Sequence, residues 1–215
     1  MKIIGAIFDM DGTLTDSMFI WQEIGKRYLL ARGITPRETL WDELRDLSGS
    51  QVPAYFQETY GLKNSHQEII EGIAAMLVPI YREEVFPKPG IFLLLDRLKA
   101  RGVKMCVASA TDLSIVEMVL EKTGLLPYFS AAFSCMTLGV GKDRPHIYEE
   151  ALAHLGTPKA ETYVFEDALY AAKTAKMAGF PVIGVFDPSA AGDAEELKAL
   201  SVLYLNDYEK DYTLF

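Results

Sequence analysis

Two aspartates directly follow the first apolar segment of the chain. Asp9 and Asp11 stand in the stretch IFDMDGTLTDS, with Gly12 and Thr13 behind them. Side chains two residues apart in a strand point to the same side, so both carboxylates can crowd one small space at the strand's end. Because like charges at short range are unfavourable, this arrangement calls for a cation or a shared proton.

Further polar residues follow other apolar segments of the chain, which are also expected to be strands. Ser109 comes after the second apolar segment, Lys142 after the third and a loop, and Glu166 with Asp167 after the fourth. Carboxylate oxygens suit a hard divalent cation, and Mg²⁺ takes few protein carboxylates because water and substrate phosphate complete its shell. Lys142 can pair with a carboxylate and a phosphate, and Ser109 can donate to phosphoryl oxygens.

Six short segments rich in apolar and β-branched residues predict the buried parallel strands that would position these groups. They are Ile3–Phe8, Val103–Ala108, Ala131–Ser134, Tyr163–Phe165, Val182–Phe186 and, more weakly, Val202–Leu205. Four amphipathic segments between the later ones predict helices, which close on Gly102, Gly124, Gly156 and Gly179. This alternation predicts an α/β fold with a doubly wound, mostly parallel sheet, whose ligand binds beyond the carboxyl ends of the strands.

Residues 16–87 predict a separate, inserted α-helical domain. Helical patterns follow one another there without a strand-like segment, and FPKPG at Phe86–Gly90 has the prolines of a rigid return hinge. We therefore expect a catalytic core of residues 1–15 and 88–215, interrupted by the helical domain.

In order and spacing, the polar groups resemble the four signature motifs of the haloacid dehalogenase-like (HAD) hydrolase superfamily. The motifs are D-x-D-G-T at Asp9–Thr13, the hydroxyl of Ser109, Lys142 within GVGKDRPHIY, and FEDA at Phe165–Ala168. The resemblance covers nearly the whole chain, and the insert is similar to the helical cap that some members carry between the first two motifs. It implies a Rossmann-like core.

The resemblance also implies roles for individual residues. Asp9 would be the nucleophile that forms an aspartyl-phosphate, and Asp11 would protonate the leaving oxygen and then activate water. The implied phosphate-binding residues are Gly12, Ser109, Ala110 and Lys142. Mg²⁺ would be held by Asp9, the backbone carbonyl of Asp11, Asp167 and Glu166, the last directly or through water. The activity implied is hydrolysis of a small phosphomonoester.

Asp11 distinguishes among the chemistries of the superfamily. Dehalogenating and phosphonate-cleaving members lack the second aspartate, so its presence favours phosphoryl transfer to water. Sugar-phosphate mutases similar to β-phosphoglucomutase are the alternative, because they share the cap and both aspartates. The resemblance implies that those mutases need a cap histidine shortly after the second aspartate, whereas this sequence has Trp21 in that neighbourhood. We expect the cap residues Trp21, Arg45 and Ser48 to contact the substrate.

The composition and net charge of the chain indicate which kinds of molecule it can bind. The 215 residues include 30 acidic and 21 basic side chains, for a formal net charge of -9. Such a surface repels phosphate backbones, so we expect no binding to nucleic acid or membrane, whereas a small phosphorylated metabolite can enter a locally positive pocket. We expect a monomer or a weak homodimer.

The two cysteines and the first residues favour the cytoplasm. Cys106 lies in the apolar run VKMCVAS, where a buried thiol is a better interpretation than a disulfide partner. The opening MKIIGAIF reaches the acidic Asp9 without a small-residue cleavage site, which disfavours a signal peptide, and no apolar run is long enough to span a membrane.

Overall fold

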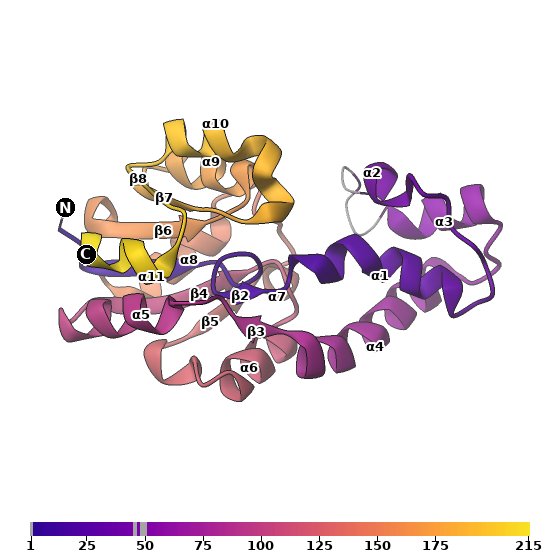
Figure 1. Cartoon of the computed structure of the whole chain (residues 1–215), viewed down its shortest axis with the longest axis horizontal. Helices are drawn as coiled ribbons and strands as arrows, with labels where there is room; N and C mark the ends of the chain where they lie inside the picture. The colour runs from indigo at the N-terminus through magenta and orange to yellow at the C-terminus, as the bar shows by residue number, and fades with distance from the viewer. Residues whose placement is uncertain (1, 45–46, 48–50) are drawn as a thin grey trace. The chain divides into compact units, whose positions relative to one another are not determined.

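The computed structural model describes residues 2–44, 47 and 51–215. The chain divides into two compact units, whose elements are labelled in Figure 1. The first unit combines Met1–Asp16 with Val85–Phe215, and the second is Ser17–Glu84. The second unit is therefore inserted between two parts of the first.

The first unit is built on a parallel sheet. Among the described residues, its six strands run in the order β5-β4-β1-β6-β7-β8, and all neighbouring pairs are parallel. They are β1 (Gly5–Phe8), β4 (Lys104–Ser109), β5 (Ala132–Ser134), β6 (Thr162–Glu166), β7 (Val182–Val185) and β8 (Leu203–Leu205). The α/β fold class is confirmed, and each predicted strand, including the weakest, has its counterpart.

The strand order determines where a ligand can bind. β1 and β6 are neighbours, yet the chain continues from β1 to β4 on one side and from β6 to β7 on the other. In doubly wound sheets the crevice at such a switch point, beyond the carboxyl ends of the strands, is the usual ligand site. The residues that follow β1 and β6 are therefore the first candidates for chemistry.

Helices cover this sheet. The described α-helices of the unit are α5 (Ile91–Ala100), α6 (Leu113–Lys122), α7 (Cys135–Leu138), α8 (His146–Leu155), α9 (Leu169–Met177), α10 (Ala194–Leu200) and α11 (Tyr208–Asp211). Short 3₁₀ turns lie at Leu126–Tyr128, Lys159–Glu161, Pro188–Asp193 and Tyr212–Leu214. The four predicted helices correspond to α5, α6, α8 and α9, whereas α7, α10 and α11 were not predicted.

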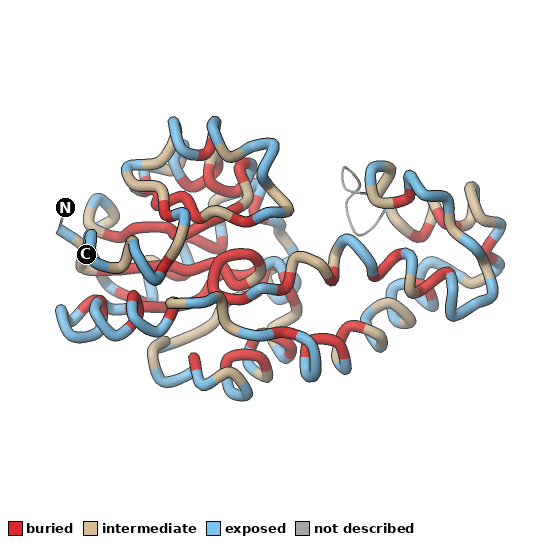
Figure 2. The backbone as a smooth tube through the Cα atoms, viewed as in Figure 1, coloured by how far each residue is buried: buried red, intermediate tan, exposed pale blue. Residues whose placement is uncertain are grey.

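Successive residues of the central strands face opposite sides of the sheet, as the strand period requires. Ile7 of β1 and its neighbour Val164 of β6 belong to an apolar cluster that also contains residues of α8, α9 and α10. The next pair, Phe8 and Phe165, stacks with ring centroids 4.1 Å apart. Figure 2 shows the buried residues along these central strands.

A small antiparallel pair closes the first unit at the insertion. β2 (Thr15–Asp16) pairs with β3 (Phe86–Pro87). Both strands belong to the first unit, at the two points where the chain passes into and out of the second unit. Two-residue strands are too short to show the alternation by which strands are recognised.

The regular elements in the described part of the second unit are all α-helices. Its helices are α1 (Met18–Leu30), α2 (Leu40–Leu44), α3 (Val52–Tyr60) and α4 (His66–Glu84). Tyr28 of α1 stacks on Phe56 of α3 with ring centroids 5.9 Å apart, within an apolar cluster that includes Ile69 of α4. Arg27 of α1 forms an ion pair of 2.9 Å with Glu84 at the end of α4. The unit therefore has a core of its own.

None of the helices in the described ranges combines the length and the apolar character needed to cross a membrane.

Candidate active site

The turn that follows β1 is held by the backbone carbonyl of Met10. This oxygen accepts the N–H and the hydroxyl of Thr15, both at 3.0 Å. Gly12 has a φ of 83°, a conformation that suits glycine because it has no Cβ. The turn fixes Asp9 and Asp11 at the carboxyl end of the sheet.

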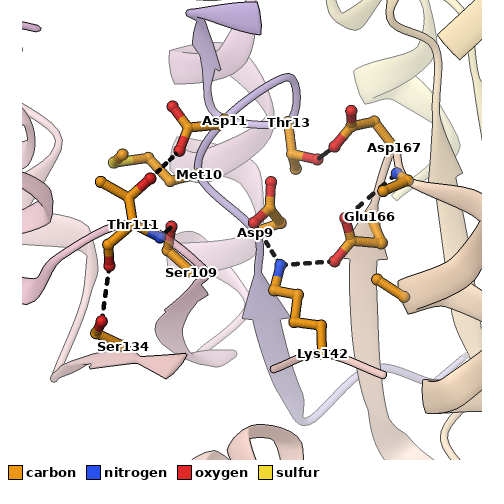
Figure 3. Close-up of polar contacts among 12 residues, drawn as sticks. Asp9, Met10, Asp11, Thr13, Ser109, Thr111, Ser134, Lys142, Glu166 and Asp167 are labelled. Carbon is orange, nitrogen blue, oxygen red and sulfur yellow. Dashed lines mark hydrogen bonds and ion pairs between the residues drawn. The ribbon is translucent and has the colours of Figure 1, made fainter. Parts of the chain in front are cut away.

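The two aspartates have different partners (Figure 3). Oδ2 of Asp11 accepts the hydroxyl of Thr111 at 2.6 Å, whereas Oδ1 of Asp9 contacts Nζ of Lys142. The acidic side chains that act most strongly on Asp9 are Glu166 and Asp167, ahead of Asp11. The D-x-D spacing leads us to expect that the negative charge near Asp9 comes from Asp11. It comes mainly from Glu166 and Asp167 instead, which are distant from Asp9 in the sequence.

Within the described residues, three carboxylates form a buried cluster. Asp9, Glu166 and Asp167 each offer an oxygen within 4.8 Å of the others, and each side chain is almost fully buried. Nζ of Lys142 lies 2.8 Å from Oε2 of Glu166 as well as against Asp9. When all three carboxylates are ionised, they and the ammonium of Lys142 leave two negative charges in excess, which a divalent cation would balance.

The pKa values follow from this burial. Loss of solvent raises the pKa of Asp9 well above its usual range, although the charge of Lys142 opposes the shift. Burial and the nearby Glu166 raise the pKa of Asp167 from 3.8 to about 8. Burial alone would lower the pKa of Lys142, but Asp9 and Glu166 hold it well above its usual value. Burial therefore raises the pKa values of two of the three carboxyl groups in the cluster, Asp9 and Asp167.

Partners from several elements orient the two acids that follow β6. The Thr13 hydroxyl donates to Oδ1 of Asp167 at 3.0 Å. Tyr148 of α8 donates its phenol to Oε2 of Glu166 at 3.3 Å, and the N–H of Ala168 donates to Oε1 at the same distance. The hydrogen bond from Tyr148 to Glu166 is not predicted by the sequence, because a tyrosine in an amphipathic helix is expected to pack in the core.

Ser109, the last residue of β4, lies in a second group of hydrogen bonds. Its Oγ accepts the N–H of Thr111 at 3.0 Å, and the carbonyl of Thr111 accepts the Ser134 hydroxyl at 2.7 Å. Thr111 and Asp112 both precede α6, and both have side chains that can cap a helix. Asp112 is the cap, since its side chain accepts the N–H of Ser114 at 2.9 Å.

The remaining predicted site residues are Ala110, Trp21, Arg45 and Ser48. Ala110 follows Ser109 and is exposed, and Trp21 lies in α1 of the second unit and is half-buried. Arg45 and Ser48 lie outside the described residues. The structure thus brings together Asp9, Lys142, Glu166 and Asp167, and leaves the expected cap contacts untested.

Comparison with known sequences identifies the class of protein. The model of the haloacid dehalogenase-like hydrolase family matches residues 5–179, which is most of the chain. The chain belongs to this hydrolase family.

Individual relatives are phosphatases, and similar solved structures share the fold. Hexitol phosphatase B of Escherichia coli (strain K12) is 28% identical over 196 residues, which cover 89% of this chain and 87% of the relative. A phosphoglycolate phosphatase of Rhodobacter capsulatus is 29% identical over 182 residues, or 82% of this chain and 81% of the relative. A CbbY variant from Rhodobacter sphaeroides, solved with xylulose 1,5-bisphosphate, has a TM-score of 0.81 and 23% identity, covering 97% of this chain and 96% of its own.

Proposed function

We propose that this chain is a Mg²⁺-dependent phosphatase that hydrolyses the phosphomonoester of a small metabolite through an aspartyl-phosphate on Asp9. The observation that carries the proposal is the buried cluster of Asp9, Glu166 and Asp167 around Lys142. Membership of the hydrolase family and the phosphatase names of the relatives support it.

The residues present fit Mg²⁺. The cluster offers hard oxygen donors, and its two excess negative charges match a divalent ion. Asp9, Asp167 and the backbone carbonyl of Asp11 would hold the ion, with Glu166 bound directly or through water. When bound, Mg²⁺ neutralises part of the charge on the phosphoryl group.

The chain's own residues would carry the two chemical steps. An Asp9 oxygen attacks phosphorus, the ester P–O bond breaks, and Asp11 gives a proton to the leaving alkoxide. Water then attacks the aspartyl-phosphate while Asp11 takes its proton, which releases phosphate and restores Asp9. Lys142 would orient Asp9, with which it forms an ion pair, and pair with the phosphoryl group.

Phosphate binding would involve Ser109, Ala110, Lys142 and the turn at Gly12. The Gly12 N–H already donates to the carbonyl of Thr15 at 3.0 Å. We therefore propose that Gly12 acts by shaping the turn, whereas the Ser109 hydroxyl and Lys142 donate to phosphoryl oxygens.

The second unit would act as a cap. In this role Ser17–Glu84 would select the substrate and exclude bulk water, with Trp21, Arg45 and Ser48 as the proposed contacts. A cap that closes over the site favours a small metabolite over nucleic acid or a folded phosphoprotein. Trp21, which replaces the histidine expected of the mutases, favours hydrolysis over the alternative of a sugar-phosphate mutase.

The proposed setting is the cytoplasm, with the chain as a monomer or weak homodimer. Cys106 and Cys135 are buried free thiols, which suits a reducing compartment. The net charge of -9 disfavours binding to nucleic acid or to an anionic membrane.

Phosphate release from a panel of sugar phosphates, polyol phosphates, phosphoglycolate and nucleotides tests the function. We expect the wild type to release phosphate selectively with Mg²⁺ and not with chelator, and Asp9→Asn to be inactive yet folded. Interconversion of hexose phosphates without release would favour the mutase. An active, unreverted Asp9→Asn variant would refute the covalent mechanism.

A further inference from the structure

Thr111 links three segments that follow neighbouring strands. Its hydroxyl donates to Oδ2 of Asp11 after β1, at 2.6 Å, and its N–H donates to Oγ of Ser109 at the end of β4, at 3.0 Å. Its carbonyl accepts the hydroxyl of Ser134, the last residue of β5, at 2.7 Å. Figure 3 shows the three bonds, which run from Thr111 to Asp11, Ser109 and Ser134. Thr111 itself is buried, with 3% of its surface exposed.

These bonds fix the orientation of two groups that the proposed reaction uses. A carboxylate is planar, so a short hydrogen bond to Oδ2 of Asp11 limits rotation of the whole group, and a bond to a charged acceptor is stronger than a neutral one. At Ser109, the N–H of Thr111 occupies a lone pair of Oγ. The hydroxyl proton of Ser109 is thereby left to donate to another acceptor.

Capping does not explain the Thr111 hydroxyl. The cap of α6 is Asp112, whose side chain accepts the N–H and the hydroxyl of Ser114 at 2.9 and 2.5 Å. The Thr111 hydroxyl points instead to a residue 100 positions away in the sequence. The backbone of Thr111 is fixed by Ser134 on the far side, so this hydroxyl is held in place before any substrate binds.

We propose that Thr111 is a positioning residue of the phosphatase, which holds Asp11 in the orientation for proton exchange and directs the Ser109 hydroxyl toward the phosphoryl group. This role rests on the proposed function, because it concerns the acid and base of that reaction. Two polar groups of Thr111 have different tasks in this role. The side-chain hydroxyl orients Asp11, and the backbone N–H orients the hydroxyl of Ser109. A substitution can remove the side-chain hydroxyl but not the backbone N–H.

Thr111→Val removes the hydroxyl and keeps the shape, whereas Thr111→Ser keeps the hydroxyl. The matched control is Thr123→Val at the opposite end of α6, where the hydroxyl donates to the carbonyl of Val119 at 2.6 Å. Rapid-quench measurement of aspartyl-phosphate formation would use p-nitrophenyl phosphate, whose leaving group needs no proton, and the alkyl phosphate that the wild type hydrolyses fastest.

We expect Thr111→Val to slow the first step with the alkyl phosphate about tenfold to a hundredfold, the effect of losing a hydrogen bond to a charged group. The loss should be much smaller with p-nitrophenyl phosphate, KM should change little, and Thr111→Ser should recover most of the rate. A merely structural defect would slow both substrates alike.

The outcomes separate the two proposals. Equal rates for Thr111→Val and Thr123→Val, or equal losses with both substrates, would overturn the role of Thr111 and leave the phosphatase standing. A folded wild type that releases phosphate from neither substrate would overturn the phosphatase itself, and this role with it.

Discussion

The ammonium of Lys142 lies 2.8 Å from Oε2 of Glu166, although the two residues are 24 positions apart, and both side chains are almost fully buried. The same ammonium contacts Asp9, which follows β1. A buried charge is tolerated only when it is paired, so Lys142 holds the acidic residues at the ends of β1 and β6 in one site. The same contacts would therefore orient the proposed nucleophile and hold the ends of two strands together.

Replacement of Lys142 tests this double role. Lys142→Met keeps the length of the side chain and removes its charge, which leaves buried carboxylates without their partner. We expect the free energy of unfolding to fall by about 3–5 kcal/mol at neutral pH, measured by urea denaturation in chelator. The control Lys173→Met breaks an exposed ion pair with Glu196, and its cost should be about 0–1 kcal/mol. Equal costs for the two variants would contradict the buried pairing.

The raised pKa of Asp167 should make the stability of the protein depend on pH. Its pKa is 3.8 ordinarily and about 8 in the folded chain, so between these values the folded state keeps a proton that the unfolded state loses. Stability from this group is therefore fully present below about pH 4 and is lost as the pH rises toward about 8. Asp9, whose pKa is also raised, acts with the same sign.

Urea denaturation in chelator across this range measures that slope. We expect Asp167→Asn to flatten it, because asparagine does not titrate. We also expect Mg²⁺ to stabilise the wild type more at pH 8 than at pH 5, since the ion binds the ionised carboxylates. A wild type in chelator that grows more stable between pH 5 and pH 8 would rule out the raised pKa values.

The fold was largely predictable because its signals are local. Strands such as Val182–Val185 are short apolar runs, and helices such as α6 have a strong amphipathic pattern with a glycine after the end. The missed helices α7 and α11 have four residues each, too few for a helical period to show. The β2–β3 pair was missed for the same reason.

The site was predictable only in part. The sequence places Asp9, Lys142, Glu166 and Asp167 at strand ends, and the geometry of a parallel sheet brings such residues together. It gives no sign that the Thr13 hydroxyl bonds Asp167, 154 positions away, or that Tyr148 bonds Glu166. Such bonds depend on how side chains from different elements pack together. The pattern of apolar and polar residues along the sequence does not predict these contacts.

Asp11→Asn separates positioning from proton transfer. Asparagine keeps an oxygen that can accept the Thr111 hydroxyl, so the local geometry should persist, but it cannot exchange a proton. We expect phosphate to bind with nearly wild-type affinity, while both chemical steps slow by about a hundredfold to ten thousandfold. Rapid-quench kinetics and phosphate titration would measure the two effects. Near-normal turnover would remove Asp11 from its acid and base role.

A hydrogen bond links α11 to the turn that follows Asp9, the proposed nucleophile. Tyr208 of α11 donates its phenol to the carbonyl of Thr13 at 3.0 Å, and Thr13 in turn donates to Asp167. The phenol is buried, so Tyr208→Phe leaves a buried carbonyl without this donor. We expect the variant to lose about 1–3 kcal/mol of unfolding free energy, the usual cost of such a group.

Tyr128→Phe is the matched control for this substitution, because it removes a phenol that bonds Asp96 at 2.7 Å on the surface. Water can replace that bond, so the cost should stay well below that of Tyr208→Phe. Because Thr13 orients Asp167, the Tyr208 variant should also bind Mg²⁺ more weakly by calorimetry, while the control binds normally. Equal stabilities and equal Mg²⁺ affinities in the two variants would show that α11 does not support the site, and that the β1 turn is held by its own hydrogen bonds to the Met10 carbonyl.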